Sequence, residues 1–215
     1  PSINNSVADL SGSIFNDGII CNGDNATINA NGSGTFTWVP ASGLSSTTGT
    51  PVNANPSVTT TYTVTIVDAN GCTATATQLI AVNTLPLPAI TETDNSGITI
   101  NDFIICSGDN ATLDAGSWSN YQWSNGTTNA LLNISGLIST ATYTVTVTDF
   151  NGCSNSANST ITVNQLPAPV ITGLTTVCSG SPANLDAGAS PGWTYLWSDA
   201  TSSTSQTINP TSSGT

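Results

Sequence analysis

Apolar and polar residues alternate with a period of two along the best-defined segments of this chain. Over residues 142–148 the apolar side chains are Tyr143, Val145 and Val147, and Thr occupies every position around them. Successive side chains of a β-strand point to opposite faces, so the pattern predicts a half-buried antiparallel strand with a Thr-coated solvent face. Residues 61–67 repeat this pattern and predict a second strand of the same kind.

Each of these two segments runs into the sequence Asp-x-Asn-Gly-Cys, at 68–72 and 149–153. Asn-Gly predicts a hairpin with a type I′ turn, which needs positive φ at both central residues. The returning strands are expected to end near 80–82 and 160–163. Short strands separated by turn signals every 8 to 12 residues predict an all-β fold built from antiparallel β-sandwiches.

The sequence repeats itself almost three times. Residues 19–28 match residues 104–113 and, more loosely, residues 177–186, and each copy is followed by an aromatic-x-Trp motif. The first two repeats close in Leu-Pro-x-Pro, at 85–88 and 166–169. We therefore expect three domains, 1–87, 88–168 and an incomplete 169–215. Because Pro fixes φ and these linkers are short, the repeats are expected to form a semi-rigid rod.

Charge removes several functions from consideration. The chain has no Lys, Arg or His, and its twelve acidic residues give a net charge of −12. Nothing can neutralise phosphates, so nucleic acid is a poor partner, and anionic membrane surfaces are disfavoured for the same reason. No imidazole or lysine amine is present to act as general base or Schiff-base nucleophile. Carboxylate pairs for glycosidase chemistry are not excluded, but the repeated Asp residues fall in predicted turns, and we expect the chain not to be an enzyme and to need no cofactor. No apolar run approaches about 18 residues, which predicts no membrane insertion.

Three motifs together carry a family resemblance. They are Cys-x-Gly-x-x-Ala-x-Leu, Tyr-x-Trp-Ser-x-Gly, and the strand-hairpin segment that ends in Asp-x-Asn-Gly-Cys. The chain resembles the PKD-like and Ig-like repeats of giant Bacteroidetes cell-surface adhesins, including the SprB-type gliding-motility adhesins. The resemblance covers nearly the whole chain and implies β-sandwich modules along a surface filament exported by type IX secretion. It brings no catalytic residues.

The five cysteines occupy repeated positions. Two pairs fall inside repeats, Cys21 with Cys72 and Cys106 with Cys153, and Cys178 is left unpaired. We expect a disulfide in each pair, with a loop-closure contribution of roughly 4 kcal/mol each, and therefore an oxidising, extracellular location. Reduced core thiols or metal ligands are the alternatives, and zinc is disfavoured because the chain has neither His nor a Cys-x-x-Cys pair.

Six oxygen-bearing residues near the cysteines form a candidate calcium site. Carboxylate and amide oxygens are ligands for hard cations, and the paired cysteines would bring the hairpins close to the segments after Cys21 and Cys106. The simpler interpretation is that Asp-x-Asn-Gly is turn chemistry, in which side chains bond the backbone, and we expect no bound metal. The candidates are Asp24, Asp68, Asn70, Asp109, Asp149 and Asn151.

The five tryptophans fall into two groups. Trp38, Trp123 and Trp197 each follow an aromatic residue two positions earlier and are expected in the cores. Trp118 and Trp193 precede those strands in Gly/Ser/Pro-rich loops, where they could stack on sugars or close the end of the sandwich. The first repeat has no Trp at that place, which favours the second role.

These features predict a non-catalytic structural stalk of an extracellular adhesin or cell-surface filament on a bacterium. Its partners would be neighbouring repeats of the chain, other filament subunits, or surface glycans. Two alternatives remain open. One is a self-assembling extracellular fibre subunit completed by a strand of its neighbour. The other is an array of carbohydrate-binding modules attached to a secreted enzyme.

The two ends of the sequence carry expectations of their own. The chain opens at Pro1 in what reads as mature sequence, without a signal peptide. At the other end, residues 214–215 align with the residues that introduce the Tyr-x-Val-x-Val strand of the second repeat. If the chain is cut from a longer array, Tyr should follow Thr215, and a hairpin Cys ten residues later should pair with Cys178. Without those strands, Leu185, Trp197 and Ile208 are expected to be half solvated.

Overall fold

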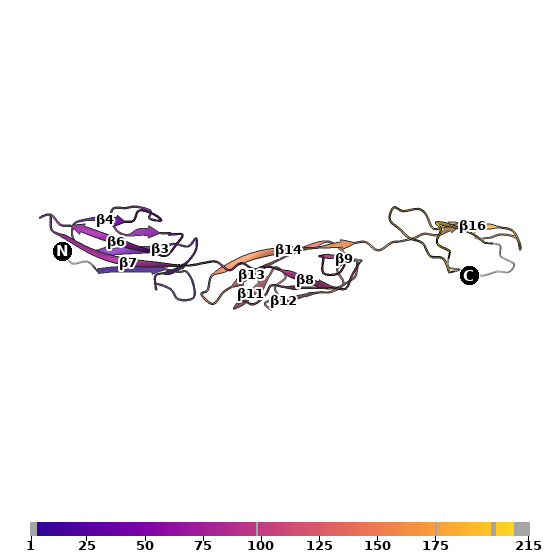
Figure 1. Ribbon diagram of the computed structural model, residues 1–215, viewed down its shortest axis with the longest axis horizontal. Helices are drawn as coiled ribbons and strands as arrows, with labels where there is room; N and C mark the ends of the chain where they lie inside the picture. Colours follow the sequence, from indigo (N-terminus) through magenta and orange to yellow (C-terminus); the bar gives the residue numbers. More distant parts are fainter. Residues whose placement is uncertain (1–3, 98, 175, 199–200, 209–215) are drawn as a thin grey trace. The chain divides into compact units, whose positions relative to one another are not determined.

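The structure is a computed structural model that describes residues 4–97, 99–174, 176–198 and 201–208. These residues contain β-strands and no helix, as the alternating pattern predicts (Figure 1). The strands are β1 (Asn4–Asp9), β2 (Ile19–Cys21), β3 (Ala26–Asn31), β4 (Thr35–Val39), β5 (Val52–Ala54), β6 (Thr60–Val67), β7 (Thr73–Asn83), β8 (Thr91–Asp94), β9 (Ile104–Cys106), β10 (Ala111–Asp114), β11 (Asn120–Trp123), β12 (Leu131–Ile134), β13 (Ala141–Thr148), β14 (Ser154–Asn164), β15 (Thr172–Gly173), β16 (Ala183–Asp186) and β17 (Ser205–Ile208).

Strands β1 to β7 form one β-sandwich, and strands β8 to β14 form a second with the same topology. The sheets of the first have the orders β1-β3-β5 and β2-β7-β6-β4, and those of the second β8-β10-β12 and β9-β14-β13-β11. In each sandwich the N-terminal segment changes sheets. β1 pairs with β3 antiparallel, whereas β2 pairs with the last strand, β7, in parallel. This arrangement is immunoglobulin-like, and the predicted fold class is confirmed.

Each sandwich has its own core around one tryptophan. Trp38 on β4 and Trp123 on β11 are 0% and 1% exposed, as the aromatic-x-Trp motif predicts. Burial does not leave the indole N–H groups unpaired, since Nε1 of Trp38 donates to the carbonyl of Gly49 at 2.8 Å and Nε1 of Trp123 to that of Asn129 at 2.9 Å. Along β13, Val145 and Val147 are fully buried.

The opposite face of the β13–β14 hairpin carries hydroxyl groups. Opposed side chains on the two strands form hydrogen bonds of 2.8 Å, at Thr142 with Thr160, Thr146 with Ser156, and Thr148 with Ser154. Cross-strand pairs of this kind stabilise a sheet without burying apolar surface. The hydroxyl side chains of the predicted Thr-coated face therefore face solvent and also join the two strands by hydrogen bonds.

The hairpin turns differ from the type predicted by Asn-Gly. Gly71 and Gly152 have positive φ, +81° and +80°, but the asparagines before them are not among the residues with positive φ. The N–H of Gly71 donates to the carbonyl of Asp68 at 3.0 Å, and the N–H of Asp68 donates to that of Cys72 at 3.0 Å. The loop is thus a three-residue connection with glycine at the left-handed position, and the type I′ prediction was wrong.

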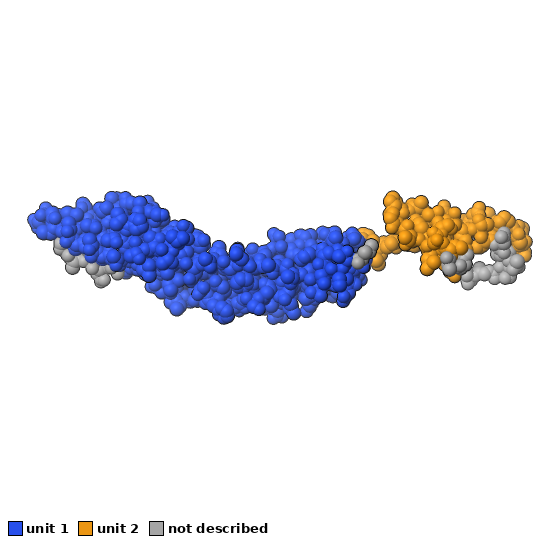
Figure 2. Space-filling model, viewed as in Figure 1, with its two compact units in different colours: residues 1–164 blue, residues 165–215 orange. Residues whose placement is uncertain are grey.

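The chain divides into two compact units, residues 1–164 and residues 165–215 (Figure 2). The first contains both sandwiches. The second contains the sheet β15-β16-β17, and its described residues include no counterparts of β13 and β14. Leu185, Trp197 and Ile208 are accordingly only half buried. The predicted partial solvation of these three side chains is confirmed, while the prediction of Trp197 as a core residue holds only in part.

Candidate functional site: the joint between the first two sandwiches

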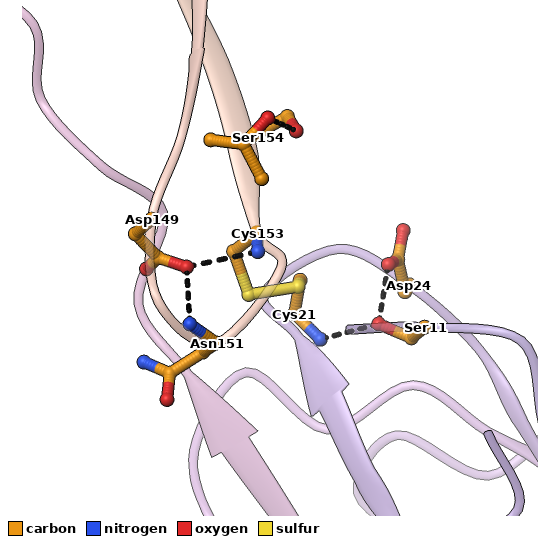
Figure 3. The surroundings of a disulfide bond; sticks show 8 residues. Ser11, Cys21, Asp24, Asp149, Asn151, Cys153 and Ser154 are labelled. Carbon is orange, nitrogen blue, oxygen red and sulfur yellow. Dashed lines mark hydrogen bonds between the residues drawn. A yellow bond between two sulfur atoms is a disulfide. The ribbon is translucent and has the colours of Figure 1, made fainter. Parts of the chain in front are cut away.

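A disulfide connects the two sandwiches of the first unit. Cys21, the last residue of β2, is bonded to Cys153, which immediately precedes β14, and their Cα atoms are 5.6 Å apart (Figure 3). Among the described residues, Cys72, Cys106 and Cys178 are free thiols. The predicted pairings of Cys21 with Cys72 and of Cys106 with Cys153 were therefore wrong. A disulfide is present, but it joins different repeats.

The length of the last strand explains why pairing inside a repeat fails. Cys72 lies just before β7, whereas Cys21 pairs in register with Asn83, the final residue of that strand. Eleven residues of extended chain span roughly 36 Å. A disulfide requires Cα atoms within about 7 Å. The second sandwich has the same geometry, because Cys106 pairs in register with Asn164, at the far end of β14 from Cys153.

The strand-end half of the joint, made by Ser11, Cys21 and Asp24, is built around one serine hydroxyl. Oγ of Ser11 accepts a 2.6 Å hydrogen bond from the N–H of Cys21 and donates a 2.6 Å bond to Oδ2 of Asp24. Ser11 is 5% and Cys21 also 5% exposed. Asp24 therefore positions the β2 terminus, and its Oδ2 is engaged by the hydroxyl of Ser11.

The hairpin half of the joint is the loop 149–153. Oδ1 of Asp149 accepts hydrogen bonds of 2.9 Å from the N–H groups of Asn151 and Cys153, which holds the loop closed (Figure 3). Asp68 does the same for Asn70 and Cys72 in the first repeat, at 2.8 and 2.9 Å. Both Asp-x-Asn-Gly segments are thus turns in which the aspartate bonds the backbone, as the simpler interpretation predicted.

The two halves also meet through backbone. The N–H of Ser13 donates to the carbonyl of Asn151 at 2.8 Å. A Cβ on Gly152 would lie 2.5 Å from the nitrogen of Ser13 and 2.6 Å from the carbonyl carbon of Gly12, so only glycine permits this approach. The linker between the sandwiches is also fixed to the second sandwich, because Nδ2 of Asn155 on β14 donates a 2.9 Å hydrogen bond to the carbonyl of Pro86.

The candidate calcium ligands do not come together in one site. In Figure 3, Asp24 and Asp149 lie on opposite sides of the disulfide. Asp109 is bonded to Ser96 at 2.6 Å, just as Asp24 is bonded to Ser11. Within the described part of the chain, no three metal-ligating side chains of His, Cys, Asp or Glu form a group.

Removing divalent cations is therefore expected to leave stability unchanged. Oδ1 of Asp68 and of Asp149 already accepts two N–H bonds each, so each carboxylate offers an ion mainly Oδ2, and the described residues bring no group of three ligating side chains together. We expect thermal unfolding with EDTA, with calcium, and with neither to give midpoints within about 1 °C. A midpoint that falls by several degrees in EDTA and recovers with calcium would show that these turns bind the ion.

The two loop tryptophans have different environments. Trp118 packs against the second core, and its Nε1 donates to the carbonyl of Ala115 at 2.8 Å, which supports the role of closing the end of the sandwich. Trp193 lines an open pocket of about 450 Å³ in the second unit, together with Pro167, Tyr195 and Trp197. Trp197 is equivalent to Trp38 and Trp123, which are buried in the first two sandwiches. The pocket therefore lies where the described residues of the second unit provide no second sheet to cover the core side chains.

A buried carboxyl pair lies on β8, a feature that the sequence analysis missed. Glu92 and Asp94 are 7% and 3% exposed, and none of the described residues provides a hydrogen-bond partner for Oε1 of Glu92. Burial, reinforced by the neighbouring Asp94, raises the pKa of Glu92. Burial alone would also raise the pKa of Asp94, but hydrogen bonds from the N–H of Ser96 and from other backbone N–H groups outweigh it and lower that pKa. At the position of Glu92 the first repeat has Val7.

The two carboxyl groups should affect stability with opposite signs. Because the pKa of Glu92 is raised by folding, its contribution is present below the ordinary Glu pKa of about 4.3 and is lost as pH rises. We therefore expect Glu92→Gln to flatten the fall in stability above that pH and to stabilise the protein at pH 7 by about 1–2 kcal/mol. Asp94→Asn should destabilise it, since the stability from a lowered pKa is present above pH 4. Chemical unfolding at pH 4 to 8 measures both effects, and a Glu92→Gln variant less stable at pH 7 would contradict the assignment.

No family model matches the chain, and no curated protein matches it. Solved structures that are similar include murine CEACAM1b (13% identity, TM-score 0.31, covering 76% of this chain and 100% of that one) and DIP-gamma IG1+IG2 (10%, 0.32, 78% and 99%). Bacteroides ovatus SGBP-B, in complex with a mixed-linkage heptasaccharide, is similar at 16% identity and a TM-score of 0.24, covering 98% of this chain and 70% of that one. None of the described residues forms a helix that could cross a membrane. The immunoglobulin-like fold is defined by the strand order of the chain itself.

Proposed function

We propose that the chain is a section of the structural stalk of an extracellular adhesin or cell-surface filament of a bacterium and is not itself catalytic. The joint is the observation that supports this most strongly. A disulfide, the backbone hydrogen bond between Ser13 and Asn151, and the linker hydrogen bond from Asn155 all hold one sandwich to the next. A chain that only needed independent binding modules would not require its neighbours to be locked together.

The same bond and the surface chemistry support an extracellular location. Disulfides persist in oxidising compartments, which supports an extracellular protein. A net charge of −12 and hydroxyl-coated strand faces would keep a crowded array soluble and would discourage lateral association. The resemblance to the repeats of SprB-type gliding-motility adhesins supports a place on a bacterial surface and type IX secretion. The internal repetition of the sequence supports the division into repeats 1–87, 88–168 and 169–215.

Small-angle X-ray scattering of the oxidised 215-residue chain tests the stalk. Two complete sandwiches, each as long as an eleven-residue strand, and an incomplete third repeat would form a rod of roughly 100 Å with a radius of gyration of about 30 Å. A compact chain of this length would have a radius of gyration of about 17 Å. We expect a radius of gyration near the larger value, and we expect it to be the same at low and high salt. The circular dichroism spectrum should show that the protein is folded. A value near 17 Å would contradict the stalk.

The fibre-subunit alternative has one observation in its favour. Leu185, Trp197 and Ile208 in the second unit are half buried where their equivalents in the second sandwich are buried. Strands from a neighbouring molecule would cover them. Electron microscopy of the purified protein distinguishes the two functions, because only a subunit assembles into filaments of regular pitch.

A further inference from the structure

The first unit contains, besides the formed joint, two unbonded halves of the same joint. Cys72 in the first sandwich occupies the place that Cys153 has in the second, and Cys106 in the second occupies the place that Cys21 has in the first. We propose that Cys72 and Cys106 are joint cysteines as well, each specific for the opposite half of another repeat. The inference goes beyond the stalk function and would hold for any assembly of these repeats.

The hairpin half is preformed around Cys72. The loop 68–72 has the same four hydrogen bonds as the loop 149–153: two from backbone N–H groups to the aspartate side chain and two between backbone groups. Gly71 and Gly152 share the same φ, +81° and +80°. A Cβ on Gly152 would strike the partner sandwich, but a Cβ on Gly71 would have nothing within 4 Å. The first hairpin thus has the docking conformation and a free docking surface.

The strand-end half is preformed around Cys106. Oγ of Ser96 accepts a 2.7 Å hydrogen bond from the N–H of Cys106 and donates a 2.6 Å bond to Asp109, as Ser11 does for Cys21 and Asp24. Gly97 has a φ of +74°, against +73° for Gly12. Ser96 and Asp109 also line an open groove of about 420 Å³. In the formed joint, the segment equivalent to 96–97 is the one that receives the hairpin.

The hairpin loop with Cys72 therefore binds a strand end of another repeat, and the strand end with Cys106 binds a hairpin loop of another repeat. Cys72 is exposed and Cys106 half buried, so both thiols are accessible to a small disulfide oxidant. In the covalent step, the thiolate of Cys106 attacks glutathione disulfide and releases one glutathione thiolate. The thiolate of Cys72 then attacks the Cys106 sulfur of the mixed disulfide and releases the second. Two electrons pass to glutathione, and one S–S bond replaces another at each stage.

Mixing two variants of the full chain tests the proposed specificity. The hairpin-thiol variant carries Cys106→Ser and Cys178→Ser and keeps Cys72. The strand-end variant carries Cys72→Ser and Cys178→Ser and keeps Cys106, so each variant has one free thiol. One variant is labelled with ¹⁵N, the two are mixed in a glutathione redox buffer, and the covalent dimers are weighed by intact mass spectrometry. The linked peptides are then mapped with an Asp-specific protease, because the chain has no trypsin site.

We expect the mixed dimer, linked from Cys72 of one variant to Cys106 of the other, to exceed each homodimer at least tenfold. Random oxidation would instead give about twice as much mixed dimer as either homodimer. As a matched control, Gly71→Asn in the hairpin-thiol variant keeps the thiol and a residue that tolerates positive φ, but adds a Cβ on the docking surface. It should return the ratio to the random value while circular dichroism stays unchanged. A random ratio without that substitution, or no mixed dimer although glutathione modifies both thiols, would overturn the proposal.

Discussion

Replacing Cys153 with Ser is expected to lower the thermal midpoint of the first unit by about 10–20 °C. The bond spans a sequence separation of 132 residues, and in the chain-entropy treatment closing such a loop contributes about 5 kcal/mol. For a unit of this length, a loss of that much stability lowers the thermal midpoint by about 10–20 °C. Differential scanning calorimetry of the oxidised protein measures the effect, and reduction of the native protein should reproduce it.

The chain offers a matched control for that substitution. Cys72 lies in the same loop of the first sandwich but is not bonded in this chain, so Cys72→Ser should change the midpoint by less than about 2 °C. Because Cys153 is fully buried, Cys21→Ser provides an independent way to break the same bond. Equal effects of Cys72→Ser and Cys153→Ser would contradict the observed pairing.

The second large effect is expected at Trp123. Its indole is 1% exposed at the centre of the second core, and truncating a buried Trp to Ala costs about 3–5 kcal/mol. Because the two sandwiches have separate cores, the loss should be confined to the second one. Hydrogen exchange followed by mass spectrometry should show β10 and β13 exchanging faster while β3 and β6 keep most of their protection.

Trp118→Ala is the control for this prediction. Trp118 is half buried at the end of the same core and keeps one indole hydrogen bond, so its removal should cost about 1–2 kcal/mol. Losses of the same size at Trp118 and Trp123 would show that the tryptophan on the strand is not the centre of the core. Faster exchange in both sandwiches after Trp123→Ala would show that the cores are not independent.

The local pattern of the sequence predicts the strands and cores well. Val145 and Val147 are buried and the Thr residues around them are not, because a period of two allows only one such arrangement on a half-buried strand. The same pattern placed Trp38 and Trp123 correctly. The alignment of the repeats also predicted that Trp197 is half solvated. The described residues of the second unit include no counterparts of β13 and β14, which contribute to the core around the equivalent tryptophan in the second sandwich.

The disulfide pairing could not be obtained from the repeats alone. Repetition shows that Cys21 and Cys106 are equivalent, and that Cys72 and Cys153 are equivalent, but it does not show which ends of the sandwich they occupy. The length of the returning strand carries that information, because eleven extended residues separate Cys72 from the register partner of Cys21. The buried Glu92 escaped notice for another reason: a short strand with two carboxyl groups has the composition of a loop.

Under tension, the bond between Cys21 and Cys153 would change which part of the chain carries load. A pull applied at both ends passes from β2 through the disulfide into β14, so the 131 residues between the two cysteines, one fewer than their separation of 132, cannot be drawn out. At about 3.5 Å per residue this shields roughly 460 Å of contour from extension. The central tryptophans of both cores, Trp38 and Trp123, lie within the shielded segment. In the oxidised protein, further lengthening of this segment would require breaking a covalent bond rather than unfolding a domain.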